Sequence, residues 1–193
     1  MIWRALALTA CSWPRTSMLK ELADMSREIE ELYARTLNRI LDIFHIYTEA
    51  DCMPAPPEMV DKLAELKDRA LKLWLEAVVV RVPVSLEVAG VTITSIELKA
   101  SSSATQVRLI GDDSKSLATY VFSGLCETSI SYTPDSALSW QFVTYCRELV
   151  SKIKEGMEKL INNLRELEEE IRAMRDEAVR VAAPILVLRE LAS

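Results

Sequence analysis

The region near the C-terminus carries the most regular pattern of apolar positions in the chain. From residue 146 onward, apolar residues recur at alternating spacings of four and three, at Cys146, Val150, Ile153, Met157, Leu160, Leu164, Leu167, Ile171, Met174, Ala178 and Val181. Residues at these spacings share one side of a helix, and about five such heptads are typical of a coiled-coil seam that packs against a partner helix. The pattern therefore predicts an assembly of long helices, but it does not identify the partner.

Two further helices are predicted before residue 79. A stripe of mostly apolar residues predicts a helix over residues 17–49, at Met18, Leu22, Met25, Ile29, Tyr33, Thr36, Ile40, Phe44 and Tyr47. Three prolines between residues 54 and 57 then end it, because each proline removes a backbone donor. A second helix starts at Pro57 and ends near Val78, with its stripe at Met59, Leu63, Leu66, Ala70, Leu73 and Ala77. We therefore expect residues 17–78 to form two helices broken at 51–57.

A period of two replaces the helical period over residues 79–132. A β-hairpin is predicted from the alternating residues up to Val88, the turn at Ala89-Gly90 and a return strand at 91–99. Three more short strands are predicted at 105–110, 117–122 and 125–132. Short connections predict an antiparallel meander, and Pro83 places the first strand at an edge. The fold class is therefore α+β: long helices in a bundle or coiled-coil arm, with an inserted antiparallel meander of about five strands.

The ends of the chain are less regular. We expect the final helix to span residues 133–183, capped by Thr133-Pro134-Asp135, and Pro184 to end or kink it before a short apolar tail at 184–193. Residues 1–16 are expected to be a leader, flexible or loosely docked, or a misassigned start. The segment Leu8-Thr9-Ala10-Cys11 resembles the lipobox of bacterial lipoproteins, although the apolar stretch before it is shorter than a secretion signal requires.

Helix lengths suggest how the seam is used. At about 1.5 Å per residue the last helix is roughly 75 Å long, the first roughly 50 Å and the second roughly 33 Å, so the second covers only part of the last. If residues 51–57 make a sharp turn, a three-helix bundle forms near the sheet and the outer seam remains for another subunit. That interface would consist of Met157, Leu160, Leu164, Leu167, Ile171, Met174, Ala178 and Val181. Changing Leu164 and Leu167 to Glu would then separate the subunits and leave the chain folded.

A bulge at residues 51–57 gives a different packing. The first two helices would then be nearly collinear, with a summed length of roughly 83 Å that approximately matches the last helix. This layout resembles the prefoldin family, in which coiled-coil helices flank β-hairpins that assemble into a barrel. The resemblance is one of layout without a matching motif, and it implies a holdase chaperone that binds unfolded clients at the helix tips.

Composition narrows the function classes. Hydrophobic residues make up 50% of the chain, and the net charge of -6 with an isoelectric point near 5.0 argues against nucleic-acid binding. The most apolar internal run, residues 71–84, contains Lys72, Glu76 and Arg81, so we expect no membrane span. Few amides and four glycines beside abundant Glu and Arg suggest a heat-adapted source.

The cysteines form no motif. Cys11, Cys52, Cys126 and Cys146 lack a C-x-x-C pair, so we expect reduced thiols, with a Cys126–Cys146 disulfide as the alternative.

The remaining candidate residues have structural explanations. His45 is predicted to be a solvated side chain, since it falls opposite the apolar stripe. Asp112, Asp113 and Lys115 are expected to form a turn rather than a metal or phosphate loop. The Glu-rich stretch at 166–170 is expected to pair along its own helix, from Arg165 to Glu169 and from Glu168 to Arg172, and Trp74 and Trp140 to pack at the junction of helices and sheet.

These observations favour a non-enzymatic structural or assembly subunit. It would self-associate through its C-terminal heptad helix, as a dimer or with another coiled-coil protein, in the cytoplasm and without nucleic acid, membrane, cofactor or metal. A prefoldin-like holdase is the first alternative. An enzyme with an unrecognised site is the second.

Overall fold

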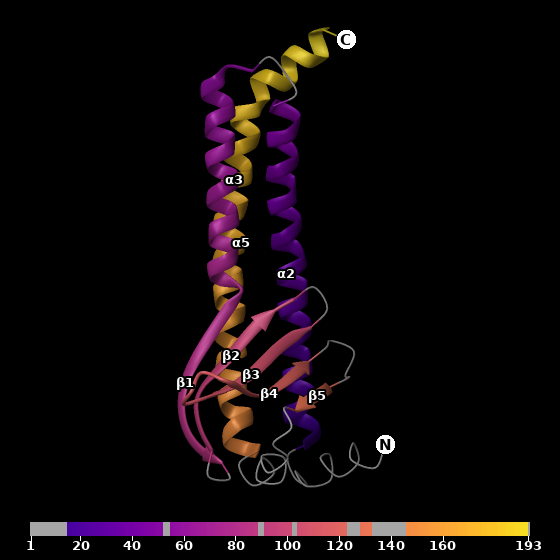
Figure 1. Ribbon diagram of the computed structural model, residues 1–193. Helices are drawn as coiled ribbons and strands as arrows, with labels where there is room; N and C mark the ends of the chain where they lie inside the picture. The colour runs from indigo at the N-terminus through magenta and orange to yellow at the C-terminus, as the bar shows by residue number, and fades with distance from the viewer. Residues whose placement is uncertain are drawn as a thin grey trace. The chain divides into compact units, whose positions relative to one another are not determined.

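The structure is a computed structural model that describes residues 15–51, 55–88, 91–101, 104–122, 128–132 and 146–192. Its elements are α2 (Arg15–Asp51), α3 (Pro57–Ala77), β1 (Val79–Val88), β2 (Val91–Ala100), β3 (Thr105–Gly111), β4 (Ser116–Phe122), β5 (Thr128–Tyr132) and α5 (Cys146–Ala192). Long helices and a five-stranded antiparallel sheet confirm the predicted α+β class (Figure 1). Two compact units result: a sheet unit of Met1–Glu31 with Val79–Asn162, and a helical unit of Leu32–Val78 with Asn163–Ser193.

The sheet is a meander in which each strand pairs with the next. Its order is β1-β2-β3-β4-β5, all antiparallel, and β1 is an edge strand with its register shifted between Pro83 and Leu86. The predicted meander and the edge position of Pro83 are therefore confirmed. Alternate side chains face a buried core, and one cross-strand row of that inner face consists of Val82, Ile96, Leu109 and Ala118.

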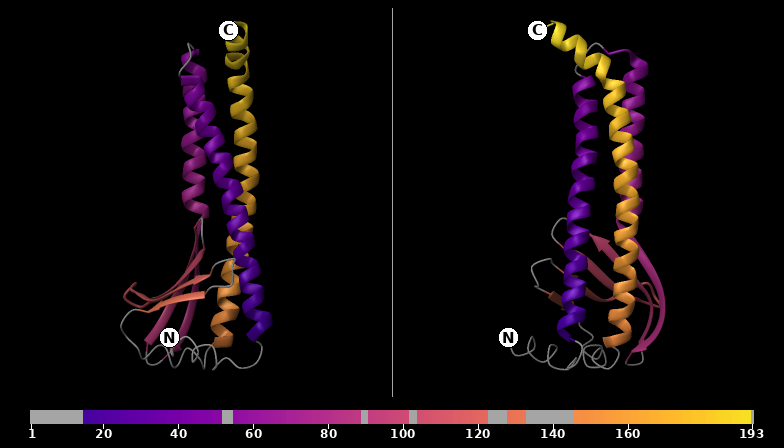
Figure 2. Two further views of the ribbon diagram at one scale, coloured as in Figure 1. Left: turned by 90° about the vertical axis from the view of Figure 1, so that its right-hand side faces the viewer. Right: turned by 180° about the vertical axis from the view of Figure 1, so that it is seen from behind.

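Helix α5 packs against the inner face of the sheet through a glycine. A Cβ built at Gly156 would overlap Leu98 Cδ1 and lie 3.0 Å from Val82 Cγ2, so only glycine lets the helix backbone come this close. Figure 2 shows the sheet beside the first part of α5. The first part of this helix is therefore covered by strands.

The first part of α2 is joined to the sheet by a buried serine. Ser26 Oγ donates a hydrogen bond to the Phe122 carbonyl oxygen at 2.9 Å and lies 3.4 Å from Thr105 Oγ1, and these two residues face each other across β3 and β4. The apolar spacing predicts a buried Met25, yet Ser26 is fully buried and Met25 is only half-buried. The hydrogen bonds make this polar burial tolerable.

In the helical unit, the second parts of α2 and α5 form a three-helix bundle with α3. The rings of Tyr33 and Trp74 lie 4.5 Å apart, and Lys67 Nζ lies 4.4 Å from the Tyr47 ring, so α2 and α3 are side by side and antiparallel. The chain therefore reverses between them, as in the sharp-turn packing (Figure 1). The collinear arrangement required by the prefoldin-like layout is wrong.

The prediction of an exposed outer seam is also wrong. Of its eight residues, all but Val181 are buried within the single chain, and Val181 is half-buried. An exposed outer seam would require α3 to lie along the first part of α5, but strands cover that part in the sheet unit. Helix α3 and the second part of α2 are therefore available to cover Leu164, Leu167, Ile171, Met174 and Ala178 in the helical unit.

Pro184 does not end α5. The helix continues to Ala192 with Pro184 inside it, so the expected end of the helix at residue 183 is wrong. Proline removes one backbone N–H, yet the apolar stripe continues past it, since Ala182 and Ile185 are both buried. The expected leader up to residue 14 and the expected helix start at residues 133–145 lie outside the described residues.

Replacing Gly156 with alanine tests the packing of α5 on the sheet. Alanine normally stabilises a helix interior relative to glycine, by about 0.5–1 kcal/mol, whereas the overlap with Leu98 should make Gly156→Ala destabilising by about 1–3 kcal/mol. Urea unfolding measures the difference, with Ser151→Ala at an exposed position of α5 as the control. A stabilised Gly156→Ala protein would show that the contact is absent.

The double variant Leu164→Glu with Leu167→Glu tests the buried seam. Because both leucines are buried within one chain, the two charges should unfold the helical unit and lower the free energy of unfolding by more than about 4 kcal/mol. Thermal unfolding followed by circular dichroism measures the effect, with Ala173→Glu at an exposed position as the control. A folded variant of lower mass would instead restore the seam as a contact between subunits.

Candidate interaction surfaces

Three exposed leucines in the helical unit border one side of the α2–α3 pair. Leu41 of α2 is 54% exposed, and Leu71 and Leu75 of α3 are 41% and 64% exposed. We call these three residues the leucine ridge. The contacts that each helix makes with its two neighbours determine which way the ridge faces.

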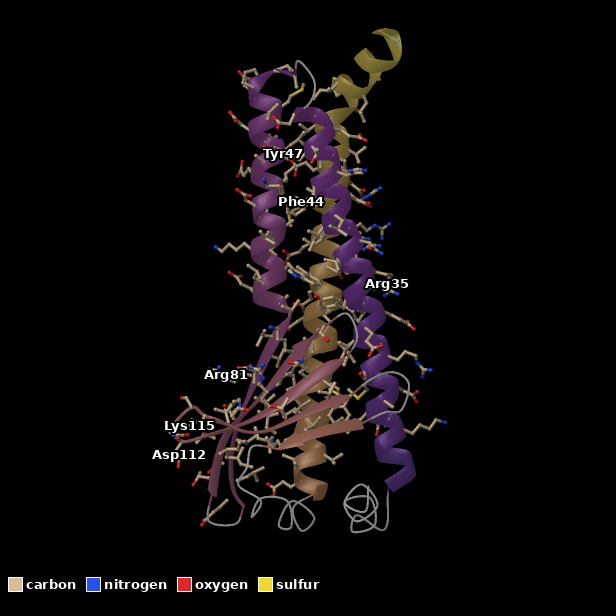
Figure 3. The ribbon with its side chains drawn as sticks, turned by 45° about the vertical axis from the view of Figure 1, so that its right-hand side comes forward. Arg35, Phe44, Tyr47, Arg81, Asp112 and Lys115 are labelled. Carbon is tan, nitrogen blue, oxygen red and sulfur yellow. The ribbon has the colours of Figure 1, made fainter. Side chains whose placement is uncertain are left out.

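On α2, opposite flanks contact α3 and α5. Phe44 lies under the ammonium group of Lys67 from α3, whereas Arg35 and Asp42 form ion pairs with α5. Leu41 precedes Phe44 by three residues, which is about 60° around a helix, and this rotation carries it away from the buried core side of α2. Leu41 therefore faces solvent on the α3 side, and Figure 3 shows Phe44 and Tyr47 on that side of α2.

On α3 the same reasoning places the other two leucines. Lys67 contacts α2, and Lys62 contacts Glu177 of α5 on the other flank. Leu71 and Leu75 follow Lys67 by one and two helical turns, and they turn progressively away from α5. All three leucines therefore border the outer side of the contact between α2 and α3, where apolar side chains remain in water.

A second surface lies on the outer face of the sheet. Arg81, Glu97 and Arg108 face one another on β1, β2 and β3. Arg81 Nη2 donates to Glu97 Oε2 at 3.0 Å, and Arg108 Nη1 lies 3.6 Å from Glu97 Oε1. Beside this row is a hollow of about 260 Å³, lined by the three charged residues and by Thr94, Ser95, Ile110, Gly111, Asp112, Ser114 and Ser116.

The acidic loop between β3 and β4 is a turn, as the sequence predicts. Ser114 adopts a left-handed conformation with φ of 60°, and the Lys115 backbone N–H donates to Asp113 Oδ1 at 3.1 Å. A side-chain hydrogen bond from Lys115 lowers the pKa of the exposed Asp113 carboxyl. These contacts account for the loop without a ligand.

Within the charged stretch of α5, Glu168 pairs with another helix, contrary to its expected pair with Arg172. Glu168 accepts from Arg35 Nε at 3.0 Å and also pairs with Arg39, both on α2, rather than with Arg172 along α5. Near the start of α3, Lys62 forms a hydrogen bond with Glu177 of α5 and lowers the pKa of the Glu177 carboxyl. A shallow hollow of about 230 Å³ there is lined by Lys62, Glu177, Arg180 and Val181.

The other candidate residues fall in three groups. His45 is exposed on α2, as predicted, and Trp74 is buried against Tyr33. Cys11, Cys52, Cys126 and Trp140 lie outside the described residues, and for Cys146 only the backbone is described.

Within the described ranges, no three His, Cys, Asp or Glu residues are grouped as metal ligands would be. No helix in the same ranges is long and apolar enough to cross a membrane.

Comparison with known proteins adds no relative. No protein-family model matches the chain, and searches of curated proteins and of solved structures find no match either. The function must therefore be argued from the two surfaces described above.

Proposed function

We propose that this protein is a non-enzymatic structural subunit that self-associates, with the leucine ridge of α2 and α3 as the contact between copies. The observation that carries the proposal is the exposure of Leu41, Leu71 and Leu75 on one side of the helical unit. Exposed apolar side chains that gather on one face are typical of protein contacts. The proposal keeps the assembly function predicted from the sequence but moves its surface away from the buried seam.

A second copy of the chain fits this ridge. A twofold contact uses the same patch on both partners, so the patch must be complementary to itself. The rim of the ridge on α3 carries both signs of charge, since Asp68 and Lys72 are exposed one turn apart. A twofold axis across the ridge can therefore set Lys72 of one copy against Asp68 of the other while the leucines pack in the centre.

Among the described residues, the resolved pKa shifts belong to ion-paired groups at the surface. Lysine partners lower the pKa of the Asp113, Glu155 and Glu177 carboxyls, and Asp113 and Glu21 raise the pKa of Lys115 and Lys154. Each shift favours the charged form of an exposed group. A catalytic carboxylic acid or amine base commonly needs the opposite shift.

The double variant Leu71→Glu with Leu75→Glu tests the proposal. We expect light scattering to show that the wild-type chain is an oligomer at micromolar concentration and that the variant has the monomer mass. Both leucines are exposed, so the variant should retain the helical content of the wild type. The matched control is Val179→Glu, at an exposed apolar position of α5, which should leave the mass unchanged.

Two results would contradict the proposal. A monomeric wild-type chain would exclude self-association under these conditions. An oligomer whose mass is unchanged in the ridge variant would move the contact elsewhere. A monomer that suppresses aggregation of an unfolded protein, and loses this activity in the ridge variant, would favour the holdase alternative.

A further inference from the structure

The outer face of the sheet carries a cluster of charged and hydroxyl groups that self-association through the leucine ridge does not use. Arg81 and Arg108 share a single carboxylate, Glu97, whose side chain is 16% exposed. The three side chains therefore carry a net charge of +1. Both oxygens of Glu97 are occupied, and each faces one guanidinium group.

The two guanidinium groups retain donors. Among the contacts of the described residues, Arg81 makes one hydrogen bond to Glu97, and Arg108 makes only the longer ion pair at 3.6 Å. Each guanidinium carries five N–H donors in a planar fork, so most of these donors remain. With side chains 67% and 44% exposed, Arg81 and Arg108 can present them to a ligand in the adjoining hollow.

Irregular strand pairing shapes the hollow. The registers of β1 with β2, β2 with β3 and β3 with β4 all shift close to it, at Pro83/Leu86, Ile93/Ser95 and Leu109/Ile110. The shift in β2 leaves Thr94 as an extra residue, so the consecutive residues Thr94 and Ser95 both line the hollow instead of facing opposite sides. Bulges commonly redirect side chains in this way.

The lining indicates the ligand class. Arg81 and Arg108 supply fork-shaped cationic donors, and Ser95 and Ser116 add hydroxyl groups. Guanidinium forks fit the paired oxygens of carboxylate and phosphate groups. The volume of about 260 Å³ is slightly below the range of about 300–1,000 Å³ for ligand pockets, so the hollow suits a small ion or molecule.

We infer that the outer face of the sheet binds a small oxyanion, a phosphate or carboxylate group, between Arg81 and Arg108. Glu97 holds the two guanidinium groups in position, and the bound anion balances the remaining positive charge. Asp112 lies at the turn end of the hollow and opposes binding, which favours ligands that place their anionic group at the arginine end. Figure 3 labels Arg81 and Asp112 on this part of the molecule.

Titration of the isotope-labelled full chain, followed by NMR, tests the inference. Sodium phosphate and sodium acetate are added in separate arms, and sodium chloride at the same ionic strength is the third arm. The amide signals of Arg81, Ser95 and Arg108 should shift and saturate with phosphate, acetate or both, but not with chloride. The first two arms distinguish the two oxyanion classes.

Variants then identify the donors. Arg81→Gln with Arg108→Gln should weaken binding by about tenfold or more, because two charge-assisted contacts are lost. Arg108→Lys keeps the charge but not the fork and should also weaken binding, whereas Asp112→Asn should strengthen it. Arg172→Gln, at an exposed position of α5, is the matched control and should bind as the wild type does.

Two outcomes would overturn the inference: signals that move equally in chloride, or a glutamine double variant that is folded and binds with unchanged affinity. If the double variant does not fold, Arg108→Lys and Asp112→Asn test the inference instead, because the first is expected to weaken oxyanion binding and the second to strengthen it. None of these measurements depends on the leucine ridge, so failure here leaves the assembly proposal standing.

Discussion

The structure depends on covering the apolar seam of α5 along its length. Buried residues recur along this helix from Leu149 to Ile185, and each must be kept from water by other parts of the same chain. Different elements do so in the two units. In the sheet unit, strand side chains approach so closely that a Cβ at Gly156 would overlap Leu98, and in the helical unit α3 and the second part of α2 complete a bundle. A uniform heptad repeat therefore serves two different kinds of packing.

Regular burial made most of the elements predictable. The 4-3 spacing identifies α3 from Pro57 and the seam of α5, and the period of two identifies all five strands and the meander, because these patterns reflect which faces are buried. The pattern does not say what covers a face. Leu164 and Leu167 look the same in sequence whether another subunit or α3 packs on them, so an exposed seam was inferred where a bundle core exists.

Polar core positions and surface sites were harder to predict, for related reasons. Ser26 was missed because a polar residue interrupts an apolar stripe, and its burial depends on a carbonyl oxygen of Phe122, which lies 96 residues away. The arginines at 81 and 108 were missed because they lie 27 positions apart and only the strand register brings them both to Glu97. Irregular registers create the hollow beside them, and a sequence pattern with a strict period of two cannot reveal a bulge.

The charges between α2 and α5 explain how a repetitive seam keeps a single register in the helical unit. Arg35 pairs with Glu168 and Asp42 with Arg175, both 133 residues apart, and three of the four side chains are exposed whereas Glu168 is largely buried. Exposed pairs of this kind contribute little stability, about 0–1 kcal/mol each. These pairs matter more for the choice between helix registers. If α2 were shifted by one heptad along α5, Arg35 would face Arg175, and a shift in the opposite direction would bring Asp42 to face Glu168. Both slips keep apolar residues in the seam but oppose like charges, so these charges favour the observed register, which the buried contacts of Ser26 and Gly156 with the sheet also require.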